Sequence, residues 1–336
     1  MAMYQRKLDI IKQPIPIIFG TYLLLIALLT YRAIVSPLPC ENVASLLSPV
    51  GGWFDGLFSP LWGRVLSVVM LLASSVVFTR IISRYSISVI RSFLPLVLYG
   101  VLVCGLIFAV GSPALQLALF LLARSAELMV GSFKRQTMYD DVMCASFYAG
   151  LAAMLIPDLI YAALLVGFQW LLYRRSLREC VAGAVMFLLP IVPAEFVGWM
   201  AGGNVGDVAV QWFEALSPLH LTSVPALMHD CGGLFGVIVL GVVVLLGAVS
   251  AVVFVAASGS MRIRARKIHN YFTTLFVVGL LMLLLGISPV VSAAVIGMSA
   301  VPLVHTYFVR RPGVGNVVLY LVLLALVVLR ITLFSK

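Results

Sequence analysis

The chain has 336 residues, of which 63% are hydrophobic and 10% are charged, and its net charge is +10 at pH 7. Soluble globular proteins have about 45–50% apolar and about 25% charged residues, so this composition excludes a soluble fold. It also gives no reason to expect nucleic-acid binding, because the basic residues stand in short gaps between long apolar runs. We therefore expect an all-α, polytopic transmembrane helix bundle that forms a single integral membrane domain over residues 1–336.

The apolar runs predict about eleven membrane spans. A bilayer core of about 30 Å requires about 20 residues of α-helix. In chain order the predicted spans are 15–35, 63–80, 92–111, 113–131, 143–156, 158–173, 179–200, 232–257, 271–287, 289–308 and 314–333. Three hairpins turn at Pro113, Pro157 and Pro289, where proline ends one helix and starts the next. Because several runs are short, the alternative is that a hairpin is one kinked helix.

The basic residues fall on one side of this arrangement. With alternating spans, 17 of the 22 fall on that side, before the first span, in the loops or at a span end: Arg6, Lys7, Lys12, Arg80, Arg84, Arg91, Lys134, Arg135, Arg174, Arg175, Arg178, Arg262, Arg264, Arg266, Lys267, Arg310 and Arg311. The positive-inside rule then predicts a cytoplasmic N-terminus and an external C-terminus. A multi-pass protein of the bacterial inner membrane is the expected setting.

Two predicted external segments, 36–62 and 201–231, are long enough to form structure of their own. Both mix aromatic and apolar residues with a few acids. Residues 43–47 and 53–61 each predict a short amphipathic helix that lies in the membrane interface. Four of the five tryptophans stand at this outer boundary, namely Trp53, Trp62, Trp199 and Trp212.

The external segments also carry residue types that can form disulfides or bind metals. Cys40 and Cys231 are the two cysteines in them, and they either form a bridge in an oxidising compartment or remain free thiols. His220, His229 and Asp230 match no zinc-binding spacing, so a surface role is expected for them. We predict no metal site, and no motif for a nucleotide or another cofactor is present.

Acidic residues concentrate on the predicted outer side. They are Glu41, Asp55, Asp158, Glu195, Asp207, Glu214 and Asp230. Individually these acids are tolerated outside the membrane; together they could line a pocket that opens outward, bind a divalent cation or supply a general base. Within the span 113–131, Arg124 and Glu127 share one helix face. A charge at this depth costs about 2.5–3.5 kcal/mol on insertion scales, so the pair is either a compensating ion pair or a headgroup-binding site.

Several stretches resemble a family of polytopic inner-membrane proteins of Bacteroidota that has no assigned activity. They are Arg91–Tyr99, Ala145–Pro157, Leu171–Glu179, Phe187–Pro190 and Pro302–Phe308. The central block is similar, more distantly, to membrane glycosyltransferases of the GT-C class. That resemblance implies a polyprenyl-phosphate-linked sugar as substrate, and an acid of the first external loop as catalytic base or metal partner. The chain departs from the class in lacking paired external acids and a large external domain.

Two functional hypotheses follow. In the first, the protein is a GT-C-like enzyme that acts on lipid-linked sugars at the outer face. Glu41 or Asp55 would then be the catalytic base, and Arg32, Arg64 or Arg124 would bind the phosphate. In the second, the chain is a non-catalytic membrane subunit that docks another envelope protein through its external segments. A transporter is the third choice. Membrane lipids are expected partners in every case, and nucleic acid in none.

Overall fold

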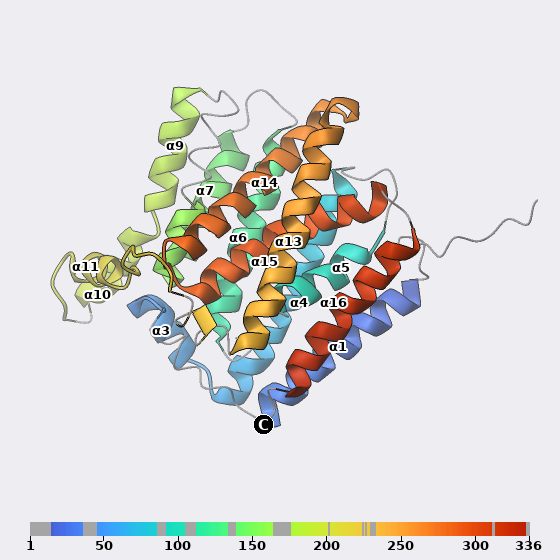
Figure 1. Ribbon diagram of the computed structural model, residues 1–336. Helices are drawn as coiled ribbons and strands as arrows, with labels where there is room; N and C mark the ends of the chain where they lie inside the picture. Colours follow the sequence, from blue (N-terminus) through green and yellow to red (C-terminus); the bar gives the residue numbers. More distant parts are fainter. Residues whose placement is uncertain are drawn as a thin grey trace, which may run out of the picture.

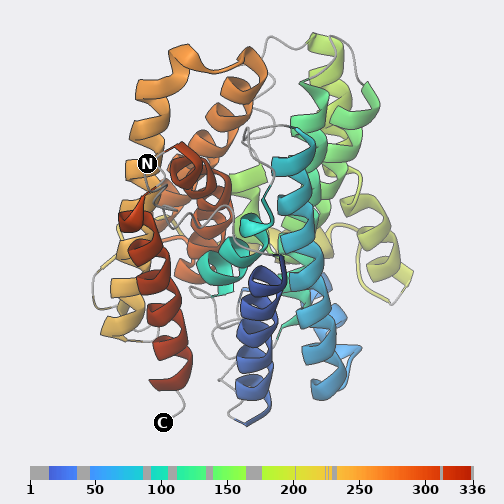
Figure 2. The same cartoon turned by 90° about the vertical axis from the view of Figure 1, so that its right-hand side faces the viewer.

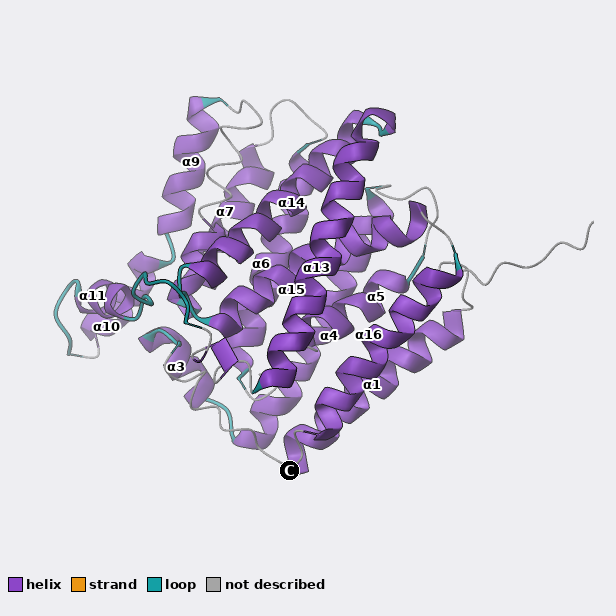
Figure 3. Ribbon diagram, in the orientation of Figure 1, coloured by secondary structure: helices purple, strands orange, loops and turns teal. Residues whose placement is uncertain are grey.

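The computed structural model describes residues 15–35, 46–85, 92–104, 112–133, 139–163, 176–200, 202–223, 225, 227–228, 233–310 and 313–333. Throughout these ranges the regular structure is helical, as Figure 3 shows. The elements are α1 (Ile15–Val35), α3 (Pro49–Gly56), α4 (Pro60–Arg84), α5 (Leu94–Tyr99), η2 (Gly100–Cys104), α6 (Pro113–Ser132), α7 (Tyr139–Leu155), η3 (Pro157–Leu159), α9 (Leu177–Leu188), α10 (Ile191–Met200), α11 (Asp207–Glu214), α13 (Leu234–Ala257), η4 (Ser258–Ser260), α14 (Ile263–Leu284), α15 (Pro289–Arg310) and α16 (Val314–Leu333).

Proline sets the start of several helices, as predicted. Helices α6 and α15 begin at Pro113 and Pro289, and α7 ends just before Pro157. Proline fits the first turn of a helix because its missing N–H would have no helical partner there. The Ser112 hydroxyl completes the start of α6 by accepting a hydrogen bond from the Leu115 N–H at 3.3 Å. The three predicted proline boundaries are thus confirmed.

Seven helices of the described chain are long and apolar enough to cross a membrane, so the protein has multi-pass helical character. They are α4, α6, the α9–α10 pair, α13, α14, α15 and α16. Four further predicted spans correspond to α1, to the short α5–η2 helix, to α7 and to 158–173, most of which lies outside the described residues. The total of eleven membrane spans remains a prediction.

Two predicted boundaries were wrong. The interfacial helix expected over 53–61 is α3, which begins at Pro49 and ends at Gly56, because Ser48 caps it and Ser59–Pro60 starts α4. Helix α14 begins at Ile263 rather than at 271. The basic stretch that was expected to be a loop therefore forms the first turns of this helix. Long basic side chains permit this, because they can extend along a helix toward water.

The bundle has two ends that differ in charge. At one, α6 and α15 begin while α7 and α14 end; we call it the acidic end, because Asp55 and Asp158 lie there. At the other, which we call the basic end, α4, α6 and α15 end while α7, α9 and α14 begin. The described basic residues gathered there are Arg80, Arg84, Arg178, Arg262, Arg264, Arg266, Lys267 and Arg310. The one-sided sorting seen in the sequence is therefore a property of the fold.

Helix α15 forms the centre of the bundle. It packs against α13, α14, α5 and η2, and a model Cβ on Gly297 would lie only 2.8 Å from the Leu102 carbonyl oxygen of η2. Such small residues let backbones approach closely in membrane proteins. Helices α1 and α16 lie side by side at the periphery (Figure 2). The Tyr22 hydroxyl of α1 is hydrogen-bonded to Ser75 of α4.

Helices α9 and α10 are the most exposed of the long apolar segments. The chain turns at Leu189 and Pro190, and α10 then runs beside α11, away from the bundle (Figure 1). Helix α9 packs on α7, where Gly150 admits the backbone of Phe187. Helix α10 buries none of its residues. Its apolar surface fits an environment of lipid rather than water.

Candidate functional site

A buried carboxylate near the basic end holds two arginines from neighbouring helices. Glu127 of α6 is 2% exposed. Its Oε1 accepts from Arg80 Nε and Nη2 of α4, both at 2.5 Å. Its Oε2 accepts from Arg124 Nη1, one helical turn back on α6. The ion pair predicted for Arg124 and Glu127 is therefore confirmed, and Arg80 joins it from across the α4–α6 contact.

This Arg80–Glu127–Arg124 cluster carries one positive charge in excess of its negative charge. Each guanidinium has five N–H donors, and Glu127 engages three of the ten. The arginine side chains are partly open, with 49% of Arg80 and 26% of Arg124 exposed. Two guanidiniums that share one carboxylate and have further N–H donors are the kind of groups that recognise phosphate or carboxylate.

A second group of aromatic and basic side chains lies at the end of α4, around Tyr85. The Arg264 guanidinium lies over the Tyr85 ring, 4.8 Å from its centroid, and the Arg84 guanidinium lies 6.0 Å from the same centroid. Burial raises the pKa of the Tyr85 hydroxyl above its usual value, so it stays neutral at pH 7. Tyr85 also lies beside Gly131 of α6. Cations from α4, α6 and α14 thus converge at one end of the bundle.

Asp55, one of the two predicted catalytic acids, caps a helix. Its Oδ1 accepts from the Ala114 N–H at 2.6 Å, and its Oδ2 accepts from the Ser112 hydroxyl at 2.6 Å. A carboxylate in this position satisfies an N–H at the start of α6 and interacts favourably with the helix dipole. Partial burial raises the pKa of Asp55, and the bonds from Ser112 and Ala114 oppose that rise. Asp55 joins the external segment to α6.

The predicted site residues do not meet in one place. Asp55 binds the start of α6, whereas Glu127 lies 13 residues after Ala114, a separation of about 20 Å at 1.5 Å per residue. Arg64 stands near the start of α4, at the acidic end. Arg32 is on the last turn of α1, and its side chain lies outside the described residues, as does all of Glu41.

Other acids that were predicted to be external bind backbone and hydroxyl groups in the same way. Asp158 is buried and accepts from the Ser217 N–H at 2.9 Å and from its hydroxyl at 2.8 Å. Glu195 accepts from the N–H groups of Gly206 and Ala209, at 3.0 and 2.6 Å, at the start of α11. Asp207 accepts from the Asn204 N–H at 2.7 Å. These carboxylates fix loops and helix starts, and they form no shared cluster among the described residues.

The two predicted external segments, 36–62 and 201–231, meet on the end of α7. From the first segment, Ser48 donates its N–H to the Leu155 carbonyl at 3.1 Å and its hydroxyl to the Met154 carbonyl at 2.5 Å. From the second, the Trp212 indole donates to the Ala153 carbonyl at 2.7 Å. Trp212 is buried. Its N–H serves to occupy a helix-terminal carbonyl.

Several predicted features of these segments fall outside the described residues. Neither Cys40 nor Cys231 is described, so their pairing stays open. His229 and Asp230 are also outside, while His220 is described and its backbone N–H donates to the Leu285 carbonyl at 3.0 Å. Within the described chain, no three His, Cys, Asp or Glu residues stand together to hold a metal ion.

Three ionisable residues inside the helices were not predicted from the sequence to have a role there. Arg80 was expected at the cytoplasmic end of the span 63–80, whereas it stands four residues before the end of α4. His269 was placed in a basic loop and His305 received no role, yet both are buried inside α14 and α15. The signal that could have found all three is an ionisable residue within a helix that spans the membrane.

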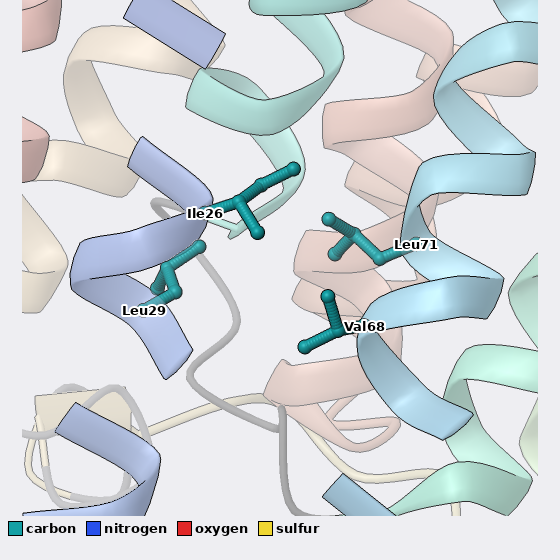
Figure 4. A pocket seen from close by; sticks show the side chains of 4 residues that line it. All are labelled: Ile26, Leu29, Val68 and Leu71. Atoms are coloured by element: carbon teal, nitrogen blue, oxygen red, sulfur yellow. The ribbon is translucent and has the colours of Figure 1, made fainter. Parts of the chain in front are cut away.

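An apolar pocket between α1 and α4 offers no polar chemistry. Ile26 and Leu29 face Val68 and Leu71 across it, as Figure 4 shows. These four side chains supply neither a hydrogen bond nor a charge, so the pocket has no group that would recognise a polar substrate. Comparison with protein-family models, curated proteins and solved structures gave no match to the chain.

Proposed function

We propose that this chain is an inner-membrane protein that binds the phosphate of a membrane lipid between α4 and α6. The proposed substrate class is the polyprenyl-phosphate-linked sugars. The observation that carries the proposal is the buried Glu127 carboxylate, which positions Arg80 and Arg124 side by side with an excess positive charge. This keeps the substrate chemistry expected from the sequence but moves its binding site away from Asp55.

The excess charge is the physical reason to expect an anion. A buried ion pair already has a large desolvation cost, and a second cation beside it needs a further counter-charge or contact with water. A phosphate between the guanidiniums would neutralise the cluster and accept their remaining N–H groups. A simple structural ion pair would require only one arginine.

The position of the cluster favours the leaflet at the basic end. Arg80 lies four residues from the end of α4, and Glu127 lies five residues from the end of α6, which is about 6–8 Å of helix rise. That is the depth at which lipid phosphates meet the hydrocarbon core. By the predicted topology this is the cytoplasmic leaflet, rather than the outer face that the glycosyltransferase likeness implies.

Asp55 is less suited to act as a catalytic base. Both of its oxygens already accept hydrogen bonds from the start of α6, and it lies at the opposite end of the bundle from the arginines. The proposal therefore concerns binding of the lipid phosphate, with any group transfer left to residues nearer the basic end.

The test is lipid binding by the purified protein in mild detergent, measured by native mass spectrometry. Polyprenyl phosphate and the corresponding uncharged polyprenol are added in parallel. Wild-type protein should retain the phosphate and not the alcohol. Because charge-assisted hydrogen bonds contribute about 1.5–3 kcal/mol, Arg80→Gln and Arg124→Gln should each weaken phosphate-lipid binding by roughly tenfold or more.

The matched control is Arg64→Gln, which removes the same charge at the acidic end. It should leave lipid binding unchanged. Arg80 is half exposed, so Arg80→Gln should fold even if Arg124→Gln does not, and the thermal unfolding midpoint reports this. Equal retention of polyprenol and polyprenyl phosphate, or unchanged binding by a folded Arg80→Gln protein, would contradict the proposal.

A further inference from the structure

A second polar group lies inside the bundle, between α14 and α15. His269 of α14 is buried, and its Nδ1 lies 2.9 Å from the Ala265 carbonyl oxygen. Its Nε2 lies 2.7 Å from the Thr306 Oγ1 of α15. The Thr306 Oγ1 lies in turn 2.9 Å from the Pro302 carbonyl oxygen. At 1.5 Å per residue, His269 stands about 9 Å inside the start of α14.

The hydrogen positions follow from what each atom can do. A carbonyl oxygen can only accept, so Nδ1 of His269 carries a hydrogen and donates it to Ala265. When the ring is neutral, Nε2 is an acceptor, and the Thr306 hydroxyl donates its hydrogen to Nε2. Every hydrogen on the imidazole and on the hydroxyl then has an acceptor.

The same geometry accommodates a protonated ring. Nε2 then carries a hydrogen and donates it to Thr306 Oγ1, while the hydroxyl turns and donates to the Pro302 carbonyl. All hydrogens are again bonded, without movement of any heavy atom. Phe254 of α13 stacks on the imidazole, with ring centroids 4.6 Å apart and an interplanar angle of 12°. An aromatic face stabilises a positive charge beside it.

His305 stands next to Thr306 and is even more deeply buried. It is 0% exposed, and neither of its ring nitrogens has a hydrogen-bond partner among the described residues. An unmet polar group in the interior costs about 1–3 kcal/mol, so packing alone does not account for a histidine here. The site therefore holds two imidazoles, of which only His269 has partners for either protonation state.

We propose that His269 and Thr306 form a proton-binding site inside the helix bundle, in which the Thr306 hydroxyl turns when His269 gains a proton. This function goes beyond lipid-phosphate binding and does not depend on it. Because two adjacent imidazolium ions repel each other in a dry interior, His269 and His305 together take up one proton.

The helices that form or adjoin the site carry other ionisable residues. Helix α14 itself brings Arg264, Arg266 and Lys267, and α15 brings Arg310 at its end. Helix α4 brings Arg80 and Arg84, and α5 brings Tyr99. Helix α13 has no ionisable residue between Leu234 and Ala257. The charge that acts directly on His269 is that of Arg310, which is also cationic, so proton uptake relies on the Thr306 and Phe254 contacts.

The test is magnetic resonance of ring-¹⁵N histidine in the full chain reconstituted in bilayers. The chain has four histidines, so His269→Gln and His305→Gln assign the two buried rings. Between about pH 8 and pH 4, which extends below the usual range of imidazole titration of about pH 5 to 8, His269 should change from a neutral to a doubly protonated ring while His305 stays neutral. Thr306→Val, which removes the hydroxyl at similar volume, should lower the His269 midpoint by about one pH unit, a tenfold loss of proton affinity.

Thr306→Ser keeps the hydroxyl and should restore the wild-type midpoint. Thr274→Val removes a hydroxyl on α14 whose one hydrogen-bond partner in the described part of the chain is the Asn270 carbonyl, at 2.6 Å, and it should change nothing. The proposal is overturned if His269 stays neutral throughout, if His305 takes up the proton in its place, or if His269 titrates identically in the Thr306→Val protein.

Discussion

At the scale of single residues, the same type of group has different roles at the two ends of the bundle. Carboxylates at the acidic end, such as Asp55 and Asp158, accept hydrogen bonds from N–H and hydroxyl groups of adjoining segments. Glu127, near the basic end, accepts from two guanidiniums instead. A carboxylate takes whichever donors its helix end presents: free N–H groups at the start of a helix, and basic side chains near the predicted cytoplasmic boundary.

Substitutions at Asp55 separate a structural from a catalytic role. Asp55→Asn keeps an oxygen for the Ala114 N–H and should lower the free energy of unfolding by less than about 1 kcal/mol. Asp55→Ala leaves two donors without an acceptor and should cost about 1–3 kcal/mol. Thermal unfolding in detergent measures both, and lipid binding per folded molecule should not change. A normally stable Asp55→Asn protein that has lost all function would instead identify Asp55 as catalytic.

The pH dependence of stability provides a second expectation for Asp55. Burial raises its pKa above the ordinary value of 3.8, so the folded protein holds this proton more tightly than the unfolded chain. The contribution of protonated Asp55 to the free energy of unfolding is therefore fully present below pH 3.8. It is lost as the pH rises through the folded-state pKa. Unfolding midpoints of wild type and Asp55→Asn should diverge across that window, because the variant has no carboxyl to titrate. Parallel curves would contradict the assignment.

At the scale of helices, close backbone contacts hold the bundle together. Gly150 of α7 faces the Phe187 carbonyl of α9, where an added Cβ would lie 2.2 Å from the oxygen. Gly247 of α13 similarly faces the ring of Phe276 on α14. Hydrophobic burial gives little drive for helix association in lipid, so such packing has a larger share in stability.

Gly150→Ala should therefore be destabilising by about 1–3 kcal/mol, the usual cost of overpacking. The matched control is Gly241→Ala in α13, whose Cβ would meet no atom within 4 Å. That change should be neutral or stabilising by up to about 1 kcal/mol, because alanine is the better helix former. Gly150→Ala should lower the unfolding midpoint, whereas Gly241→Ala should leave it unchanged or raise it. Equal shifts in the two variants would show that α7 and α9 are not in close contact.

At the scale of the whole molecule, the basic end is predicted to face the cytoplasm. Its described cations come from α4, α9, α14 and α15, which meet there although they are far apart in the chain. Val205, beside α11, and Arg266, on α14, are exposed at opposite ends. In a background without native cysteines, Val205→Cys should react with an impermeant thiol reagent in intact cells, and Arg266→Cys only after permeabilisation. The reverse pattern would invert the proposed orientation.

Composition and pattern in the sequence were enough to predict the helical class, the proline-started helices and the one-sided sorting of basic residues. These are local properties, since hydrophobic run length, proline geometry and loop charge act along the chain. The pairing of Arg124 with Glu127 was predictable for the same reason, because both lie on one helix face.

Only the tertiary structure decided which distant groups meet. Arg80 reaches Glu127 across two helices, Trp212 reaches the end of α7, and Thr306 reaches His269. Asp55 was separated from the arginines because it binds the opposite end of α6. Such partners depend on helix packing and rotation, and apolar runs do not specify them, because any of their faces can meet lipid or protein at similar cost.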